Sequence, residues 1–185
     1  MLPQITAFPL RPARVHEAYG PLAASLAAVS AAQADALLWI RERWRPEAVS
    51  AAGFATYFDP ARMLLAQVKD QTETLTVAEE GLRDGAVPLV VMELTVPLSL
   101  TAGRRLQLAA QAGQSTGICL IPEGMGSPSA ETRWRCSPVP DPNDAGDSTL
   151  QSWELIKNKS GTTGVWHVRW SQSARRLIVV SSPRE

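Results

Sequence analysis

The residues closest to a known chemistry lie in the first predicted strand, turn and helix of the sequence. Residues 15–19 predict a strand, Gly20 and Pro21 predict a turn, and the alanine-rich stretch that follows predicts a helix to about Ala32. A strand, a glycine turn and a helix in this order form the phosphate-binding loop of many nucleotide-binding proteins. The order also fits an ordinary buried strand, turn and helix, because one glycine is not a motif.

The side chains that a phosphate-binding loop needs are replaced in this sequence. Counted from Gly20, the loop spacing places a second glycine at position 25, a lysine at 26 and a hydroxyl residue at 27. The sequence has Ser25, Leu26 and Ala27. Without the lysine, no side-chain cation reaches the β- and γ-phosphates, and without the hydroxyl, Mg²⁺ loses its protein ligand. We interpret the segment as a degenerate nucleotide site and expect no cofactor and no metal.

A carboxylate follows the most apolar predicted strand of the chain. Glu93 comes directly after residues 87–92, V-P-L-V-V-M, at the carboxyl end of a central strand. A carboxylate in this position can hold Mg²⁺ or orient a water molecule. Because Leu26 occupies the lysine position, we instead expect Glu93 to bond to neighbouring backbone groups or to an arginine.

The remaining titratable residues do not form a recognisable catalytic set. We expect Glu42 to pair with Arg41 or Arg45, which lie beside it in the sequence. The two histidines, His16 and His167, alternate with other residues inside predicted strands and are interpreted as structural. Because no nucleophile and base are recognisably paired, we predict that the protein is not an enzyme.

Arginine and tryptophan recur together in a way that suggests binding. Arginine beside tryptophan is typical of protein interface hot spots and of platforms for single-stranded nucleic acid. The alternative is that the arginines are solvated edge charges and the tryptophans fill the core. The residues that carry the binding hypothesis are Arg41, Trp44, Arg45, Arg104 and Arg105, with Arg133 and Arg135 as further candidates.

Composition restricts the class of protein. The 185 residues suit one compact domain, or one domain with a tail. Equal numbers of acidic and basic residues give zero formal net charge, so no global field attracts nucleic acid or anionic lipid. Cys119 and Cys136 have no metal-like spacing and fit a reducing compartment. With neither a secretory signal nor an apolar run of about 18 residues, we expect a cytoplasmic protein.

The predicted elements indicate an α/β fold. Residues 1–12, which contain three prolines, predict an extended lead-in, and residues 13–182 predict a single domain. Strands and helices alternate in the first two-thirds, which predicts a mostly parallel sheet flanked by helices, and the alternating strands that follow predict an antiparallel extension. The predicted strands are 15–19, 36–40, 63–68, 87–92, 117–121, 132–137, 152–159, 165–170 and 175–180.

The segments between these strands carry recognisable helix and loop signals. Thr72 and Thr101 are the predicted N-caps of two long helices, and Gly85 is the predicted end of the first of them. Pro46 can open a short helix. The predicted loops are 53–60, a glycine-, serine- and proline-rich flexible stretch at 124–130, and a mobile stretch at 138–148.

The order of these pieces resembles the RecA recombinase core over about residues 13–170. V-H-E-A-Y-G-P at 15–21 looks like the RecA strand that leads into its phosphate loop. D-G-A-V-P-L-V-V-M-E at 84–93 looks like the strand that ends in the Walker B aspartate, with Glu93 in that place. W-E-L-I-K-N-K at 153–159 resembles a late RecA strand. The resemblance implies a RecA-like core with a degenerate P-loop fold.

A narrower resemblance is to the ImuA family, shortened RecA paralogues. The ordered set that carries it is V-H-E, L-W-I-R with R-W-R-P-E, F-D-P-A-R-M-L-L, A-E-E-G-L-R-D-G-A-V, R-R-L-Q-L-A-A, T-R-W-R and G-V-W-H-V-R-W. It implies a non-catalytic adaptor in SOS-inducible translesion synthesis and mutagenesis, a DNA-damage and DNA-repair context.

The implied partners are an ImuB-type relative of Y-family polymerases, an error-prone DnaE-type polymerase and RecA itself. Contact with DNA is expected to be indirect, and no membrane partner is expected. Two alternatives stay open. One is a division inhibitor like SulA, another shortened RecA relative, which binds the tubulin-like protein FtsZ. The other is a residual nucleotide-binding ATPase.

Overall fold

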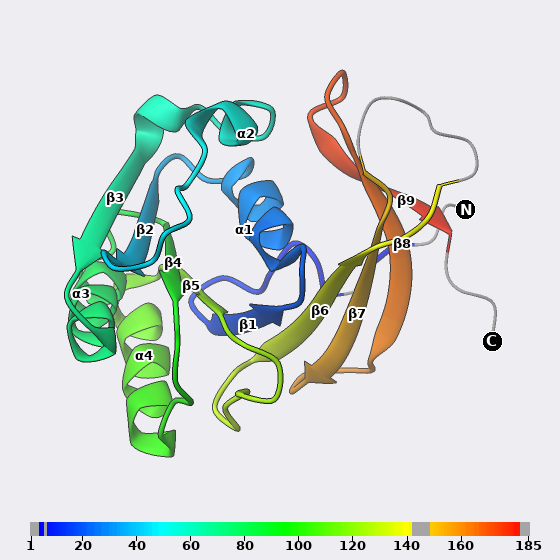
Figure 1. Ribbon diagram of the computed structural model, residues 1–185. Coiled ribbons are helices and arrows are strands. Elements are labelled where there is room, and N and C mark those ends of the chain that lie inside the picture. The colour runs from blue at the N-terminus through cyan, green and yellow to red at the C-terminus, as the bar shows by residue number, and fades with distance from the viewer. Residues whose placement is uncertain (1–3, 6, 142–148, 182–185) are drawn as a thin grey trace.

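A single sheet organises the chain in the computed structural model, which describes residues 4, 5, 7–141 and 149–181 (Figure 1). Within this part of the chain, the sheet has nine strands. The elements in chain order are β1 Val15–Tyr19, α1 Ala23–Ala31, β2 Leu37–Glu42, α2 Ala51–Ala55, the short 3₁₀ helix η1 Pro60–Arg62, β3 Met63–Val68, α3 Gln71–Asp84, β4 Leu89–Glu93, α4 Leu100–Gly113, β5 Thr116–Leu120, β6 Thr132–Pro138, β7 Gln151–Asn158, β8 Gly164–Ser171 and β9 Arg176–Ser181.

The order of the strands across the sheet is β3-β2-β4-β5-β1-β6-β7-β8-β9. Neighbouring strands from β3 to β6 are parallel, and each pair from β6 to β9 is antiparallel. Parallel neighbours need crossover connections, and helices lie in those that link β1 to β5 along the chain, whereas β6 to β9 are adjacent both in the chain and in the sheet. The prediction of a mostly parallel sheet with an antiparallel C-terminal extension is therefore confirmed.

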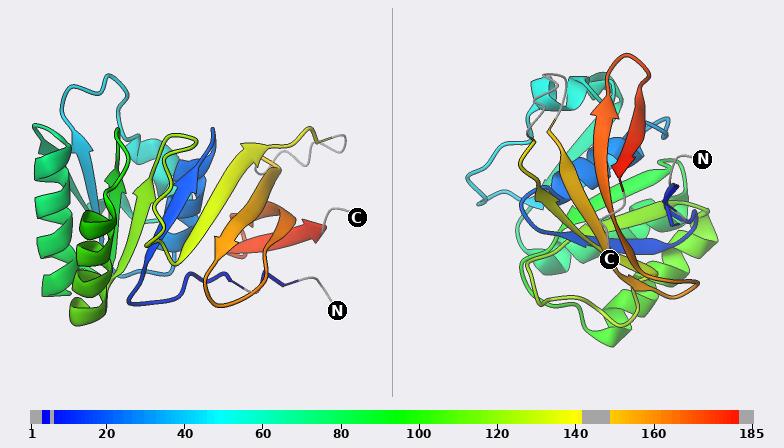
Figure 2. Two further views of the ribbon diagram at one scale, coloured as in Figure 1. Left: turned by 90° about the horizontal axis from the view of Figure 1, so that it is seen from below. Right: turned by 90° about the vertical axis from the view of Figure 1, so that its right-hand side faces the viewer.

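Helices cover both faces of the parallel part. Figure 1 shows α1 on one face and the pair α3 and α4 on the other, and Figure 2 shows this pair beside the β3 end of the sheet. Strand β4 is apolar from Leu89 to Met92 and packs against the helices on both faces, because successive side chains point in opposite directions. Val91 packs with the α1 side, and Val90 packs with the α3 and α4 side.

The antiparallel extension is filled by tryptophans on the face that continues the α1 core. Trp134, Trp153, Trp166 and Trp170 are all buried, and they come from β6, β7 and β8. The Trp134 ring centroid lies 6.2 Å from that of Trp153 and 6.1 Å from that of Trp166. Large aromatic rings supply much of the buried area in this half of the sheet.

The two long helices begin earlier than predicted. Asp70, not Thr72, is the N-cap of α3, and its carboxylate accepts a hydrogen bond from the Glu73 amide at 3.0 Å. Ser99, not Thr101, caps α4 in the same way. Both threonine predictions are wrong, because a residue with extended backbone and a suitable oxygen stands two positions before each.

The remaining differences lie in the loops. Pro46 does not open a helix. The short helix α2 begins at Ala51, and Ser50 caps it. The predicted loop at 53–60 therefore overlaps helical residues at its start and at Pro60. The helix end predicted at Gly85 has a left-handed φ of 72°, as a C-terminal glycine requires. Most of the loop predicted at 138–148 lies outside the described residues.

The glycine- and serine-rich stretch at 124–130, predicted to be flexible, is anchored by hydrogen bonds. Lys157 Nζ donates to the carbonyls of Pro128 at 2.6 Å and of Ala130 at 2.9 Å. Lys159 Nζ donates to the Ser129 carbonyl at 2.7 Å. These bonds tie the loop to β7 and to the residue that follows it. Among the described residues, no helix has the length and apolar character that crossing a membrane requires.

Candidate functional site

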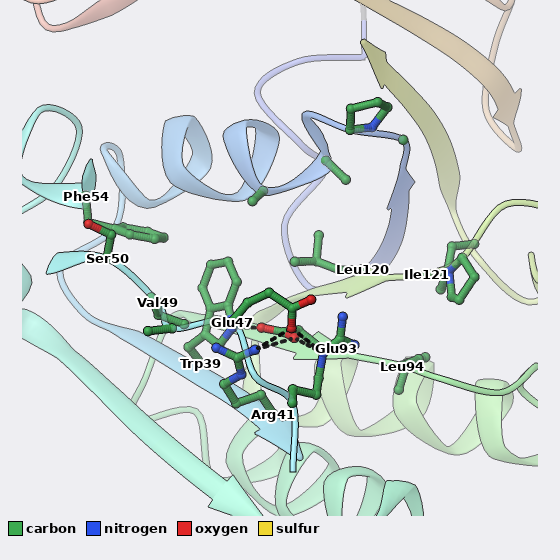
Figure 3. Close-up of a pocket in the computed structure, with 17 residues that line it drawn as sticks. Trp39, Arg41, Glu47, Val49, Ser50, Phe54, Glu93, Leu94, Leu120 and Ile121 are labelled. Carbon is green, nitrogen blue, oxygen red and sulfur yellow. Dashed lines mark hydrogen bonds and ion pairs between the residues drawn. The ribbon is translucent and has the colours of Figure 1, made fainter. Parts of the chain in front are cut away.

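A cleft of about 510 Å³ opens at the carboxyl ends of the parallel strands (Figure 3). In open parallel sheets, ligands bind at this edge. The cleft is bounded by the turn after β1, by the ends of β2, β4 and β5, and by the segment that leads into α2. The lining residues are Gly20, Pro21, Ala23, Ala24, Trp39, Arg41, Arg45, Glu47, Ala48, Val49, Ser50, Phe54, Glu93, Leu94, Leu120, Ile121 and Pro122.

The glycine of the turn is required by its surroundings. Gly20 has a φ of 96°, and a Cβ placed there would lie 2.5 Å from the carbonyl oxygen of Cys136. That carbonyl accepts a hydrogen bond from the Leu22 amide at 3.1 Å. Only glycine combines this backbone conformation with this close approach. The turn is thus held against β6 through backbone groups.

Besides the Leu22 amide, two further amide donors around the turn are used within the protein. The Ala23 amide donates to the Gly20 carbonyl at 3.1 Å, and the Ser25 amide donates to the Leu22 carbonyl at 2.9 Å. Pro21 has no amide hydrogen. A phosphate-binding loop presents these donors to the ligand instead. In addition, α1 already begins at Ala23, where a loop of the expected spacing would still run.

The positions that should carry the lysine and hydroxyl side chains point into the core. Leu26 and Ala27 are both 0% exposed and pack in the core cluster on the α1 side of the sheet. Ser25 is half-buried. A lysine at position 26 would therefore need its ammonium group inside apolar packing, which is strongly unfavourable. Ser25, Leu26 and Ala27 therefore do not fit the binding of Mg²⁺ with a nucleoside triphosphate.

Glu93 lies in the cleft wall with both oxygens bonded. Its Oε1 accepts a hydrogen bond from Trp39 Nε1 at 2.7 Å. Its Oε2 lies 3.0 Å from Arg45 Nε and 3.5 Å from Arg41 Nη2. The carboxylate is nearly buried, so these charge-assisted contacts compensate for its lost hydration. A metal ion at Glu93 would have to displace the arginines.

A second, looser carboxylate completes the charged cluster in Figure 3. Glu47 Oε2 lies 3.8 Å from Arg41 Nη2 and 3.9 Å from Arg45 Nε, and the glutamate side chain is 69% exposed. Arg41 itself is buried, and its Nε has no hydrogen-bond partner among the described residues. The cluster therefore contains two guanidinium groups, one firmly bonded carboxylate and one loosely held carboxylate.

The rest of the wall is apolar. The rings of Trp39 and Phe54 meet edge to face with centroids 5.3 Å apart. Val49 lies on the segment that leads into α2, and Leu120 ends β5. An apolar cleft with a few convergent polar groups is the usual form of a binding site. This arrangement can bind a ligand that combines an apolar group with an anionic one.

The structure separates the other residues of the binding hypothesis. Arg104 and Arg105 lie on α4, on the opposite face of the sheet from the cleft, and Arg105 pairs with Glu79 at 2.7 Å. Trp44 is 62% exposed. Arg135 pairs across strands with Glu154 at 3.6 Å. Of the predicted binding residues, the cleft brings together only Arg41 and Arg45.

The predicted ion pair of Glu42 with a neighbouring arginine is wrong. Glu42 accepts hydrogen bonds from Trp44 Nε1 and, at 2.8 Å, from Thr95 Oγ1. Consecutive strand residues point to opposite faces, so Glu42 and Arg41 face away from each other. Arg45 lies with Arg41 on the Glu93 side.

Several residues of the site could not be recognised from the sequence. Trp39, Glu47 and Phe54 line the cleft but were not singled out, because apolar and loop residues do not reveal their neighbours. An ion pair with a buried carboxylate was also missed. Glu17, 1% exposed, accepts from Arg133 Nε at 2.7 Å and from the Ser127 amide at 2.8 Å. These partners are more than 100 positions away from Glu17 along the chain.

The described residues contain no group of three His, Cys, Asp or Glu side chains that could hold a metal ion. Cys119 and Cys136 are buried, and burial raises their thiol pKa values well above the usual range. A buried thiol of this kind is unreactive. His16 Nε2 donates to the Arg11 carbonyl, which leaves Nδ1 to accept from Thr132 Oγ1. It is a fully bonded structural histidine within the sheet.

The fold and the cleft define an α/β protein with a mostly parallel sheet, helices on both of its faces and a cleft at the carboxyl ends of the parallel strands. No protein-family model matches the chain. It is 31% identical over 147 residues to Protein ImuA from two strains of Caulobacter vibrioides. The match covers 71% of this chain and 59% of the relative, so it spans somewhat more than half of that protein. This similarity supports the assignment to the ImuA family that the ordered motifs predicted.

Proposed function

We propose that this protein is a nucleotide-independent component of the ImuA and ImuB mutagenesis system and that it acts through protein contacts. The similarity to Protein ImuA supports the system. In the SOS response it would serve translesion synthesis as an adaptor. Its main partner would be an ImuB-type Y-family polymerase relative. An error-prone DnaE-type polymerase and RecA are further expected partners in the cytoplasm, and contact with DNA would be indirect.

The observation that best supports a role without nucleotide is the state of the turn after β1. The Leu22, Ala23 and Ser25 amides are bonded to internal carbonyls, and Leu26 and Ala27 are packed in the core. Restoring nucleotide affinity would therefore require rebuilding the start of α1, not only changing two side chains. Binding surfaces do not depend on the lysine or on Mg²⁺, so they can persist in a fold that has lost its nucleotide.

One titration and one chromatography experiment test the proposal. A fluorescent ATP analogue with Mg²⁺ should show no saturable binding to the full chain. The ImuB-type protein from the same genome should form a complex with the chain that survives size-exclusion chromatography, with and without nucleotide. Micromolar affinity for the analogue would favour the residual ATPase and contradict the proposal. Binding to FtsZ without binding to the ImuB-type protein would favour the division inhibitor.

A further inference from the structure

In the charged cluster of the cleft, the positive charge of one arginine is balanced only by a loosely held carboxylate. Glu93 is bonded through both oxygens and offsets one of the two arginines. Glu47, which must offset the other, lies beyond hydrogen-bond distance from both guanidinium groups. A mostly exposed carboxylate at such distances gains little from the ion pair. Another carboxylate could replace it at small cost.

The buried arginine provides an independent sign of an incomplete site. The Arg41 side chain is 5% exposed, lines the cleft and has an Nε without an acceptor among the described residues. Buried donors are nearly always bonded, and an unbonded one calls for an explanation. In Figure 3, Arg41 lies beside Glu47 and Glu93 at the cleft wall. A guanidinium held here is prepared to receive one more acceptor group.

We propose that the cleft binds an acidic, apolar segment of a protein partner, whose carboxylate displaces Glu47 from Arg45 and Arg41. This inference rests on the proposed function, because it takes the partner to be a protein. Under this inference, the cleft beside the turn after β1 recognises a peptide instead of a nucleotide. The bound carboxylate would form close charge-assisted hydrogen bonds with Arg45, which is accessible, while Arg41 forms the back of the site.

Charge matching favours a carboxylate over a phosphate. Once Glu47 is displaced, two arginines and Glu93 leave one net positive charge, which a single carboxylate neutralises. A triphosphate carries several negative charges and would face the Glu93 carboxylate. Three amides around the turn, those of Leu22, Ala23 and Ser25, already donate to carbonyls and are not available to a phosphate.

The chain itself displays the kind of segment that the cleft accommodates. Residues 45–50 contain neither helix nor strand, and within them Glu47 and Val49 both line the cleft. An acidic and an aliphatic side chain two positions apart thus already lie against the arginines and the apolar wall. A partner segment with the same pattern could place a larger side chain near Trp39 and Phe54. The cleft volume of about 510 Å³ is large enough for such side chains.

A displayed library of random 12-residue peptides tests the inference, selected in parallel on the wild-type chain and on Glu47→Gln. Enriched peptides should carry Asp or Glu with an aliphatic or aromatic residue two positions away. A synthetic peptide from the selection should bind Glu47→Gln about threefold more tightly than wild type, because the internal competitor is weakened. Replacing its acidic residue by the amide should reduce affinity about tenfold or more.

Two arginine variants locate the binding site. Arg45→Gln should weaken peptide binding about tenfold, whereas the matched Arg104→Gln, on the opposite face of the sheet, should leave it unchanged. Equal thermal melting of the variants establishes that they fold. The inference is overturned if no peptide is enriched, if the enriched peptides lack acidic residues, if Arg45→Gln binds as wild type does, or if Glu47→Gln has no effect. Competition by ATP with Mg²⁺ would also overturn it.

A complex with the ImuB-type protein separates this inference from the proposed function. If that protein binds wild type and Arg45→Gln equally and acidic peptides do not bind the cleft, the inference fails, while the proposed function stands. If it binds neither chain but acidic peptides bind in the expected way, the proposed function fails and the peptide site stands. Loss of ImuB binding in Arg45→Gln alone would support both.

Discussion

Restoring the missing lysine of the phosphate loop should unfold the protein instead of restoring nucleotide binding. Leu26 is 0% exposed and packs in the core on the α1 side of the sheet. Deleting a buried leucine costs about 2–5 kcal/mol of unfolding free energy. Leaving an unpaired charge in apolar surroundings costs about 3–5 kcal/mol when it cannot reach water. We expect Leu26→Lys to lose at least about 4 kcal/mol, which approaches the whole stability of many domains.

Urea denaturation followed by circular dichroism measures this loss, and titration with a fluorescent ATP analogue tests for binding. Ala24→Lys is the matched control, because position 24 is exposed at the cleft, and its cost should stay within about 0.5 kcal/mol. Leu26→Met, which nearly conserves volume, should cost less than about 1.5 kcal/mol. If Leu26→Lys kept wild-type stability and bound the analogue, position 26 would face a ligand and our description of the turn would be wrong.

Three further stability predictions follow from other parts of the fold. Burial lowers the pKa of His16 to about 4, so the unfolded chain takes up its proton first as pH falls below about 6.5. The stabilisation that neutral, buried His16 gives the folded state is therefore fully present above that pH. It should decrease by about 2 kcal/mol between pH 7 and pH 5, measured as the difference in unfolding free energy between wild type and His16→Gln in urea denaturation. Gly20→Ala should cost more than Gly124→Ala. Both glycines have a positive φ, which costs about 1–2 kcal/mol with a side chain, but only position 20 adds a backbone clash. Equal losses would contradict the close approach. Glu17→Gln should cost about 3–5 kcal/mol, because it removes the charge of a fully buried carboxylate from its ion pair with Arg133, whereas Glu154→Gln at an exposed pair should cost less than about 1 kcal/mol. A small loss at Glu17 would mean that its pair is solvated.

The sequence predicted the elements best where hydrophobicity alone decides them. The strands at 15–19 and 63–68 have the bounds that were predicted. β2 extends two residues beyond its predicted end, because Arg41 and Glu42 are buried through partners elsewhere in the chain. Charged residues normally mark the end of a buried strand, and only tertiary contacts override that rule. The helix starts were displaced because several capping residues stand close together, and local sequence does not rank them.

The sequence allowed the turn of the candidate site to be predicted, but not the residues that form the walls of the cleft. Gly20, Leu26 and Glu93 were recognised because their positions follow a motif spacing. Trp39 and Phe54 come from separate elements, and only the packing of α2 against β2 brings their rings together. Glu47 was hidden for a similar reason, because its role depends on two arginines that the fold brings to the same side. Pairings across long sequence separations carry no signal in a single sequence.

The uneven distribution of tryptophans makes the two halves of the sheet distinguishable by spectroscopy. Four indoles lie buried together in the antiparallel half, whereas Trp39 stands in the wall of the cleft and Trp44 is exposed to solvent. The near-ultraviolet dichroism of the protein should therefore arise mainly from the C-terminal hairpins, whose fixed packing that signal requires. A chain that retained Trp39 as its single emitter would instead report on the cleft, since any group that enters it changes the polarity around that ring.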